Sequence, residues 1–238
     1  MPDGLIPHLT LVFDLDGTLV DTAPDLISAT NHVLEHVGLP PVDTDSLRPW
    51  VGHGAKYMIE RAIGPAGANL TAVEHDILLQ RYFDFYASNI AVASRPFEGV
   101  VLALERFRAA NIKLAVCTNK LERLSNLLMD TLDLSRFFVA VAGRDTLSAA
   151  KPHPEHLLGT IRMAGGDPTR AIMIGDSSVD VTTARAAGIP VIGVSFGYTD
   201  TQVQEFSPDL VIDHYRELDE AISRIKSPVT HSSWTRAE

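Results

Sequence analysis

The chain has 238 residues, of which 45% are hydrophobic and 21% charged, a composition typical of a soluble protein with one substantial core and a smaller accessory unit. It contains no apolar run of about 18 residues and no N-terminal signal pattern, so we expect a cytoplasmic protein without a membrane segment. The formal net charge of −10 disfavours nucleic acid as a partner, and the single cysteine excludes an internal disulfide.

The first predicted element is a short buried strand that ends in two carboxylates. The apolar run 11–13 is β-prone, and Gly17 then lets the chain turn sharply away from the sheet edge. Asp14 and Asp16 therefore lie at the carboxyl end of the strand, where open parallel sheets bind their ligands. Because their side chains point to opposite sides, Asp14 can face a substrate while the peptide carbonyl of Asp16 helps to hold a cation.

A long stretch of helical periodicity follows, and it exceeds the length of an ordinary loop. One apolar stripe belongs to a helix from Pro24 to Gly38 and comprises Leu26, Thr30, Val33, Leu34 and Val37. A second stripe comprises Ile77, Leu78, Arg81, Tyr82 and Phe85. We therefore expect an α-helical domain at residues 23–95, inserted into a core made of residues 1–22 and 96–226.

Within the inserted domain, the glycine-rich segment 48–56 breaks the helical pattern. Its cations Arg48 and Lys56 are candidates to meet a substrate carboxylate, while the alternative interpretation is a plain turn between helices. The remaining chain alternates helices and strands, which predicts an α/β fold with a doubly wound parallel sheet. The predicted elements are helix 101–109, strand 112–117, helix 121–132, strand 138–142, helix 155–164, strand 171–174, helix 179–187, strand 191–194 and a strand near 209–212. Residues 227–238 have the composition of a flexible tail.

Polar groups follow two further strands. Thr118 and Asn119 come after strand 112–117 and can donate hydrogen bonds to phosphoryl oxygens without adding charge, although they would also suit the N-cap of the next helix. Asp176 and Asp180 follow strand 171–174 and are separated by one helical turn, so both can face the same cleft. The alternative for Asp176 is a plain N-cap.

Lys151 stands before two prolines at the start of helix 155–164. Pro154 suits the first turn of that helix, and the stiff entry would present the ammonium with little conformational freedom. The alternative is an ordinary exposed lysine. We interpret His153 as a helix-start or surface residue.

Four aspartates that converge on one cleft repel one another, so the arrangement predicts a bound cation. Oxygen ligands suit Mg²⁺, whereas the sequence contains no histidine or cysteine pattern for zinc.

The segment Asp14-Leu15-Asp16-Gly17-Thr18-Leu19 resembles the first motif of the haloacid dehalogenase superfamily. The resemblance implies a Rossmann-like core with an inserted helical cap and an aspartyl-phosphate mechanism that needs Mg²⁺. It makes Asp14 the nucleophile and Asp16 the general acid and base. It also implies that Thr118, with Asn119 beside it, and Lys151 bind the phosphoryl group. The implied metal site comprises Asp14, Asp16, Asp176 and Asp180, the last acting through water or Lys151.

The segment from Arg48 to Gly54, the triplet Thr118-Asn119-Lys120 and Phe196-Gly197-Tyr198 are similar to the phosphoglycolate phosphatase branch of that superfamily. This similarity implies a small phosphorylated metabolite as the substrate and a monomer or homodimer. The alternatives are a β-phosphoglucomutase-like mutase or sugar phosphatase, a haloacid dehalogenase and a non-catalytic phosphate-sensing module. Asp16 argues against the last two, because neither needs a proton shuttle at that position.

Overall fold

The computed structural model describes residues 8–198 and 201–226, and within them six parallel strands form one sheet. The strand order is β5-β4-β1-β6-β7-β8, so β1 lies in the middle between β4 and β6. The strands are β1 (Thr10–Phe13), β4 (Lys113–Cys117), β5 (Ala140–Ala142), β6 (Ala171–Gly175), β7 (Val191–Val194) and β8 (Leu210–Ile212). The predicted parallel sheet is confirmed, and the predicted tail 227–238 lies outside the described residues.

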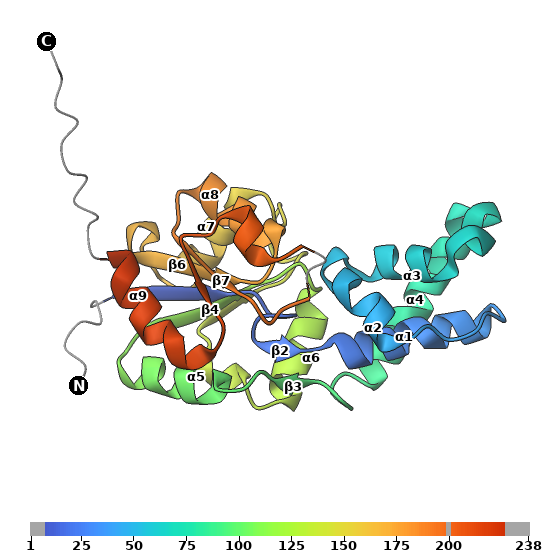
Figure 1. Cartoon of the computed structure of the whole chain (residues 1–238), viewed down its shortest axis with the longest axis horizontal. Helices are drawn as coiled ribbons and strands as arrows, with labels where there is room; N and C mark the ends of the chain where they lie inside the picture. The colour runs from blue at the N-terminus through green and yellow to red at the C-terminus, as the bar shows by residue number, and fades with distance from the viewer. Residues whose placement is uncertain (1–7, 199–200, 227–238) are drawn as a thin grey trace, which may run out of the picture.

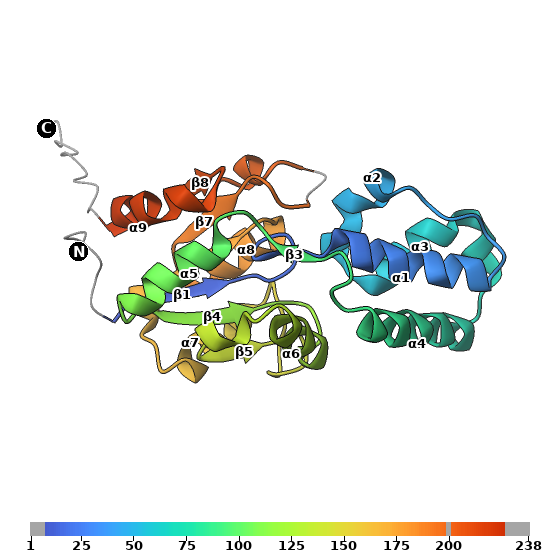
Figure 2. The ribbon, with the colours of Figure 1, turned by 90° about the horizontal axis from the view of Figure 1, so that it is seen from below.

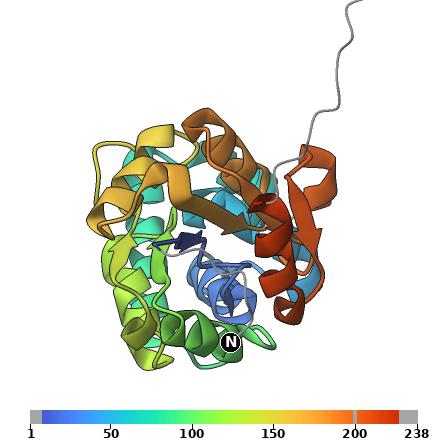
Figure 3. The ribbon, with the colours of Figure 1, turned by 90° about the vertical axis from the view of Figure 1, so that its left-hand side faces the viewer.

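Helices cover both faces of the sheet, as Figure 3 shows from one end of the molecule. They are α5 (Val100–Ala109), α6 (Glu122–Thr131), α7 (Pro154–Met163), α8 (Ser178–Ala187) and α9 (Leu218–Lys226). Alternate residues of β1 separate the two cores: Leu11 and Phe13 belong to the cluster that contains Phe107 of α5, whereas Val12 packs with Leu157 of α7. Figure 2 shows α5 lying over β1 and β4. The doubly wound α/β fold is therefore confirmed.

A group of helices lies beyond the carboxyl ends of the strands, on the right in Figure 1. It consists of α1 (Ala23–His36), α2 (Thr44–Leu47), α3 (Ala55–Ile63) and α4 (Ala72–Ser88). A short antiparallel ribbon of β2 (Val20–Asp21) and β3 (Arg95–Pro96) joins this group to the sheet. The 3-10 turns are η1 (Arg48–His53), η2 (Gly64–Asn69), η3 (Ser135–Phe137), η4 (Pro168–Arg170), η5 (Val203–Phe206) and η6 (Tyr215–Glu217). In the described part of the chain, no helix has both the length and the apolar character that crossing a membrane requires.

The structure corrects two details of the predicted helical stripes. Val37 follows the end of α1 and is 37% exposed, because the chain turns away at Gly38. On α4, Ile77 is 54% exposed, and the buried positions are Leu78, Tyr82 and Tyr86. The buried face therefore follows an i, i+4, i+8 spacing that ends at Tyr86, one residue after the last position of the predicted stripe.

Candidate active site

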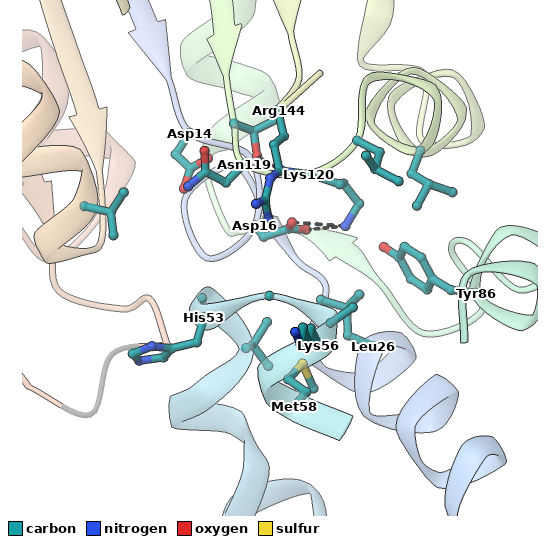
Figure 4. Close-up of a pocket in the computed structure, with 18 of the residues that line it drawn as sticks. Asp14, Asp16, Leu26, His53, Lys56, Met58, Tyr86, Asn119, Lys120 and Arg144 are labelled. Carbon is teal, nitrogen blue, oxygen red and sulfur yellow. Dashed lines mark hydrogen bonds and ion pairs between the residues drawn. The ribbon is translucent and has the colours of Figure 1, made fainter. Parts of the chain in front are cut away.

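A cavity of about 410 Å³ lies between the strand ends and the group of helices α1–α4 (Figure 4). Seven of the predicted site residues line it: Asp14, Asp16, Thr118, Asn119, Lys151, Asp176 and, from α3, Lys56. Asp180 is fully buried behind them and contacts Lys151. Arg48 is not among the lining residues. The parallel sheet thus brings the polar groups of three separate strand ends to one place.

The side chain of Lys151 joins two of the carboxylates. Its Nζ lies 2.9 Å from Oδ1 of Asp14 and donates a hydrogen bond of 2.6 Å to Oδ1 of Asp180. Burial lowers the pKa of Lys151, but the charges of Asp14 and Asp180 outweigh this effect and raise it, so the side chain is an ammonium. The alternative of an exposed lysine is wrong, because only 2% of this side chain is accessible.

The backbone of Lys151 is fixed from both sides. Its N–H donates to Nδ1 of His156 at 3.0 Å, and its carbonyl oxygen accepts from Nδ2 of Asn119 at 2.9 Å. His153 is the N-cap of α7, and its Nδ1 accepts from the N–H of Glu155, which agrees with the helix-start interpretation. The ammonium is therefore presented from a rigid segment.

Asp176 follows β6 and is held by two neighbours. Its Oδ1 accepts from the Thr18 hydroxyl at 3.0 Å, and its Oδ2 accepts from the N–H of Tyr198 at 3.0 Å. Gly17 has φ +82°, and a Cβ there would lie 2.4 Å from Asp176 Oδ2, so this turn requires glycine on two grounds. The N-cap of α8 is Ser177, which overturns the alternative of Asp176 as a plain N-cap.

Ser177 and Asp180 form a capping box at the start of α8. The Ser177 hydroxyl donates to Oδ2 of Asp180 at 2.6 Å, and the Ser177 N–H donates to the same oxygen at 3.1 Å. Since Lys151 occupies Oδ1, both oxygens of Asp180 already have partners. This arrangement leaves Asp180 to orient Lys151 from behind.

Asp14, Asp176 and Asp180 form a cluster whose candidate ligand oxygens all lie within 4.8 Å of one another. Burial and the neighbouring carboxylates raise the pKa of Asp176 to about 8, against the hydrogen bonds from Tyr198 and Thr18. Burial also raises the pKa of Asp14 to about 6, although Lys151 opposes this. The cluster could hold a metal ion, whose charge would make the ionised carboxylates compatible with burial, and its donors are oxygen atoms alone.

The side chain of Asp16 lies on the other side of the strand end and has different partners. Lys120 Nζ donates to both carboxylate oxygens, at 2.9 and 3.0 Å, and the Thr22 hydroxyl donates to Oδ1 at 2.7 Å. The Lys120 side chain is only 5% exposed, and its Nζ lies 4.6 Å from the ring centre of Tyr86 on α4. Lys120 therefore links the core carboxylate to the helices above it.

Thr118 and Asn119 stay in the cavity wall and do not cap the following helix. Helix α6 begins at Glu122, and its N-cap position is Leu121. The Thr118 side chain is almost fully buried, and its hydroxyl accepts from the N–H of Lys120 at 3.2 Å. The interpretation of this pair as a helix cap is therefore wrong.

The two cationic candidates from segment 48–56 have different surroundings. Arg48 donates to Asp21 at 2.8 Å, and its guanidinium carbon lies 5.0 Å from the ring centre of Tyr198. Arg48 thus contacts the ribbon that joins the helices to the sheet. Lys56 lines the cavity, but its side chain is 73% exposed and lies 3.9 Å from Glu60.

Three residues of the site have roles that the sequence patterns did not indicate. They are Lys120, which the sequence indicates only as part of the Thr118-Asn119-Lys120 triplet, Ser177, and Arg144 in the loop after β5, and all three line the cavity. The spacing Ser-x-x-Asp at 177–180 was a usable signal for the capping box. Arg144 carries no such local signal, because its contribution depends on where its loop packs.

Comparison with known proteins identifies the family of this chain. Residues 11–194 match the model of the haloacid dehalogenase-like hydrolase family, and the chain belongs to that family. The phosphoglycolate phosphatase of Mesorhizobium japonicum is 52% identical over 208 residues, which cover 87% of this chain and 92% of that protein. The phosphoglycolate phosphatase of Caulobacter vibrioides is 48% identical over 212 residues, which cover 89% of this chain and 90% of that protein.

The fold has a close counterpart among solved structures. A crystal structure of a predicted phosphoglycolate phosphatase from Haemophilus somnus superposes with a TM-score of 0.85. The two chains are 28% identical, and the match covers 92% of this chain and 99% of that one. The resemblance of the first motif to the haloacid dehalogenase superfamily is thereby confirmed.

Proposed function

We propose that this hydrolase is a Mg²⁺-dependent phosphatase that converts 2-phosphoglycolate to glycolate and phosphate. The observation that carries the proposal is the buried Asp14, which lies 2.9 Å from the Lys151 ammonium and shares a carboxylate cluster with Asp176. Such a group can attack phosphorus while neighbouring positive charge neutralises the phosphoryl oxygens. The names of the Mesorhizobium and Caulobacter relatives support the choice of substrate.

The donor set fits magnesium. Asp14 and Asp176 would hold the ion, with the peptide carbonyl of Asp16, while Asp180 acts through Lys151 or water. The raised pKa values of Asp14 and Asp176 support this assignment, because a cation at that place would stabilise the ionised carboxylates that burial and neighbouring carboxylates disfavour. When bound, Mg²⁺ supplies positive charge to the phosphoryl oxygens.

The proposed reaction has two steps on the protein. An Asp14 oxygen attacks phosphorus in line, the bond from phosphorus to the leaving oxygen breaks, and Asp16 gives that oxygen a proton. Water then attacks phosphorus of the aspartyl phosphate, Asp16 takes a proton from the water, and the bond to Asp14 breaks. Thr118 and Lys151 hold the phosphoryl oxygens throughout, and Asn119 fixes the backbone of Lys151.

We assign shielding of the leaving group from water to the helical domain at residues 23–95. Its side chains close the cavity on the side opposite the aspartates with mainly apolar groups, among them Leu26, Met58 and Tyr86 (Figure 4). An apolar wall excludes water from the aspartyl phosphate until the leaving group has departed.

Steady-state kinetics on a panel of phosphomonoesters with Mg²⁺ tests the proposal. We expect 2-phosphoglycolate to have the highest kcat/KM, and Asp14→Asn to abolish phosphate release while the protein stays folded. Asp133→Asn is a matched control, since the Asp133 side chain is 77% exposed on the surface. A sugar phosphate or nucleotide well ahead in the panel would reject the substrate, and turnover by Asp14→Asn would reject the nucleophile.

A further inference from the structure

We propose that Arg144, from the core loop after β5, binds the carboxylate of the substrate's leaving group. The inference rests on the proposed function, because it assumes a phosphomonoester with a carboxylate next to the ester oxygen. The sequence had suggested Arg48 and Lys56 for this task. The structure favours a different cation, supplied by the core.

The first argument concerns which cations near the cavity already have partners. Lys151 is shared by two aspartates, Lys120 contacts both oxygens of Asp16, and Arg48 is paired with Asp21 away from the cavity wall. Lys56 and Arg144 are both exposed residues, and Lys56 lies 3.9 Å from Glu60. Arg144 lines the cavity, and among residues 8–198 and 201–226 its side chain makes no ion pair or hydrogen bond.

The second argument concerns direction. Figure 4 shows the Arg144 side chain running from the core loop into the cavity, on the side where Asp16 and Lys120 lie. Asp16 is the residue assigned to protonate the leaving oxygen. In 2-phosphoglycolate a single CH₂ group separates that oxygen from the carboxylate, so the carboxylate must lie near Asp16 as well. Arg144 therefore approaches the place where the substrate's second charge would be.

The third argument is that the backbone at Arg144 is fixed. The Arg144 N–H donates to the Lys120 carbonyl oxygen at 2.9 Å, which ties the loop after β5 to the loop after β4. Asp145 accepts from the N–H of Glu122 at 2.8 Å, and the Thr146 hydroxyl donates to the Glu122 side chain at 2.6 Å. Both contacts hold the Arg144 loop against the start of α6, so the side chain extends from a preorganised base.

Gly143 shows how closely this loop is packed. A Cβ at this position would lie 2.3 Å from the Glu122 nitrogen and 2.8 Å from the Lys120 carbonyl oxygen, so only glycine allows the approach. The Gly143 carbonyl oxygen also lies 3.0 Å from Nε2 of His156, which in turn accepts from Lys151 through Nδ1. The base of Arg144 is therefore connected to the lysine assigned to the phosphoryl group.

The balance of charges at the site also favours an additional cation when an anionic substrate binds. Asp14, Asp16, Asp176 and Asp180 are offset by Lys120, Lys151 and a divalent ion, which leaves the loaded cavity formally neutral without Arg144. A substrate with both a phosphate and a carboxylate is strongly anionic and favours an additional positive group. A guanidinium can hold a carboxylate through two parallel hydrogen bonds, which gives it an advantage over a lysine.

The kinetic test compares Arg144→Met and Arg144→Lys with the wild type on two substrates. Ethyl phosphate has a methyl group in place of the carboxylate of 2-phosphoglycolate. We expect Arg144→Met to lower kcat/KM for 2-phosphoglycolate by about 10- to 100-fold, the usual range for a hydrogen bond to a charged group. Ethyl phosphate should change less than about threefold, and Arg144→Lys should recover part of the loss. An equal loss on both substrates would overturn the proposal, and so would no loss on either.

A binding test separates this inference from the proposed function. 3-Phosphonopropionate carries a carboxylate and cannot be hydrolysed, and propylphosphonate is its counterpart without the carboxylate. By titration calorimetry, Arg144→Met should bind 3-phosphonopropionate at least about tenfold more weakly and propylphosphonate with unchanged affinity. The control Arg108→Met, at an exposed position of α5 outside the cavity lining, should leave both affinities unchanged. If wild-type turnover shows no preference for 2-phosphoglycolate over ethyl phosphate, the substrate assignment fails, yet calorimetry still decides the role of Arg144. Unchanged affinity of Arg144→Met for 3-phosphonopropionate would refute it.

Discussion

The carboxylate cluster makes the stability of the metal-free protein depend on pH in an unusual direction. Burial and the charges of Asp180 and Asp14 raise the pKa of Asp176 from 3.8 to about 8. The folded protein therefore holds a proton on Asp176 that the unfolded chain has lost above about pH 4. Because the folded state binds more protons between these values, its stability must fall as the pH rises through that window.

The magnitude follows from the pKa. One pKa unit corresponds to about 1.4 kcal/mol, so an ionised Asp176 costs the folded metal-free protein on the order of 5 kcal/mol relative to the unfolded chain. This cost accumulates evenly, by about 1.4 kcal/mol per pH unit, between about pH 4 and pH 8. Between pH 6 and pH 8.5 we expect the free energy of unfolding to fall by about 3 kcal/mol, which includes a small part from Asp14, whose pKa is about 6.

Urea denaturation in EDTA at pH 6 and pH 8.5, repeated with Mg²⁺, measures this effect. Excess Mg²⁺ should remove most of the loss at pH 8.5, since the ion binds the ionised cluster of the folded state. Asp176→Asn is the matched control, because the amide does not titrate and other ionisable groups are unchanged. An equal fall in stability in wild type and Asp176→Asn, or no fall in wild type, would refute the reasoning.

Three further predictions concern side chains that line the cavity. Lys120→Met should lower kcat by about 10-fold or more, because it removes two hydrogen bonds from the Asp16 carboxylate. Lys120→Arg should retain more activity than Lys120→Met, and stopped assays of phosphate release measure both variants. Tyr82→Phe should leave the free energy of unfolding unchanged or raise it by about 1 kcal/mol in urea denaturation, because the buried hydroxyl has no partner among the described residues. Ser177→Ala should lower the free energy of unfolding by about 1 kcal/mol in urea denaturation, because Ser177 caps α8. It should also lower kcat, because Ser177 holds Asp180, and an unchanged kcat would contradict this second role.

The sequence predicts which strand ends meet, and the reason is topological. Asp14, Thr118 and Asp176 each follow a short apolar run, and the carboxyl ends of parallel strands share one edge of the sheet. Asp180 joins them because one helical turn separates it from Asp176. The patterns therefore indicate the cluster of Asp14, Asp176 and Asp180 that the structure contains.

The same patterns do not indicate where long side chains outside the strands point. Arg48 and Lys56 both lie in a glycine-rich segment that folds into η1 and the start of α3. In the folded chain Arg48 contacts Asp21 of the ribbon, whereas Lys56 lies in the cavity wall. Tyr86 was missed because the predicted stripe placed the neighbouring Phe85 on the buried face of α4, where the structure places Tyr86. Lys120 and Arg144 come together through one backbone hydrogen bond between two loops, a contact between residues that are distant in the sequence.

A buried histidine connects the two loops that would bind the two ends of the substrate. The Lys151 N–H must donate to Nδ1 of His156, so the ring carries its proton on Nε2 and donates it to the Gly143 carbonyl oxygen. Burial, together with the nearby Lys151 charge, lowers the pKa of His156, so the ring stays neutral and keeps both hydrogen bonds near neutral pH. Lys151 and the loop that carries Arg144 are thus held at a fixed separation. A rigid separation between a phosphate-binding lysine and a carboxylate-binding arginine would favour substrates whose two anionic groups lie at the matching distance. The size of the cavity alone does not restrict that distance.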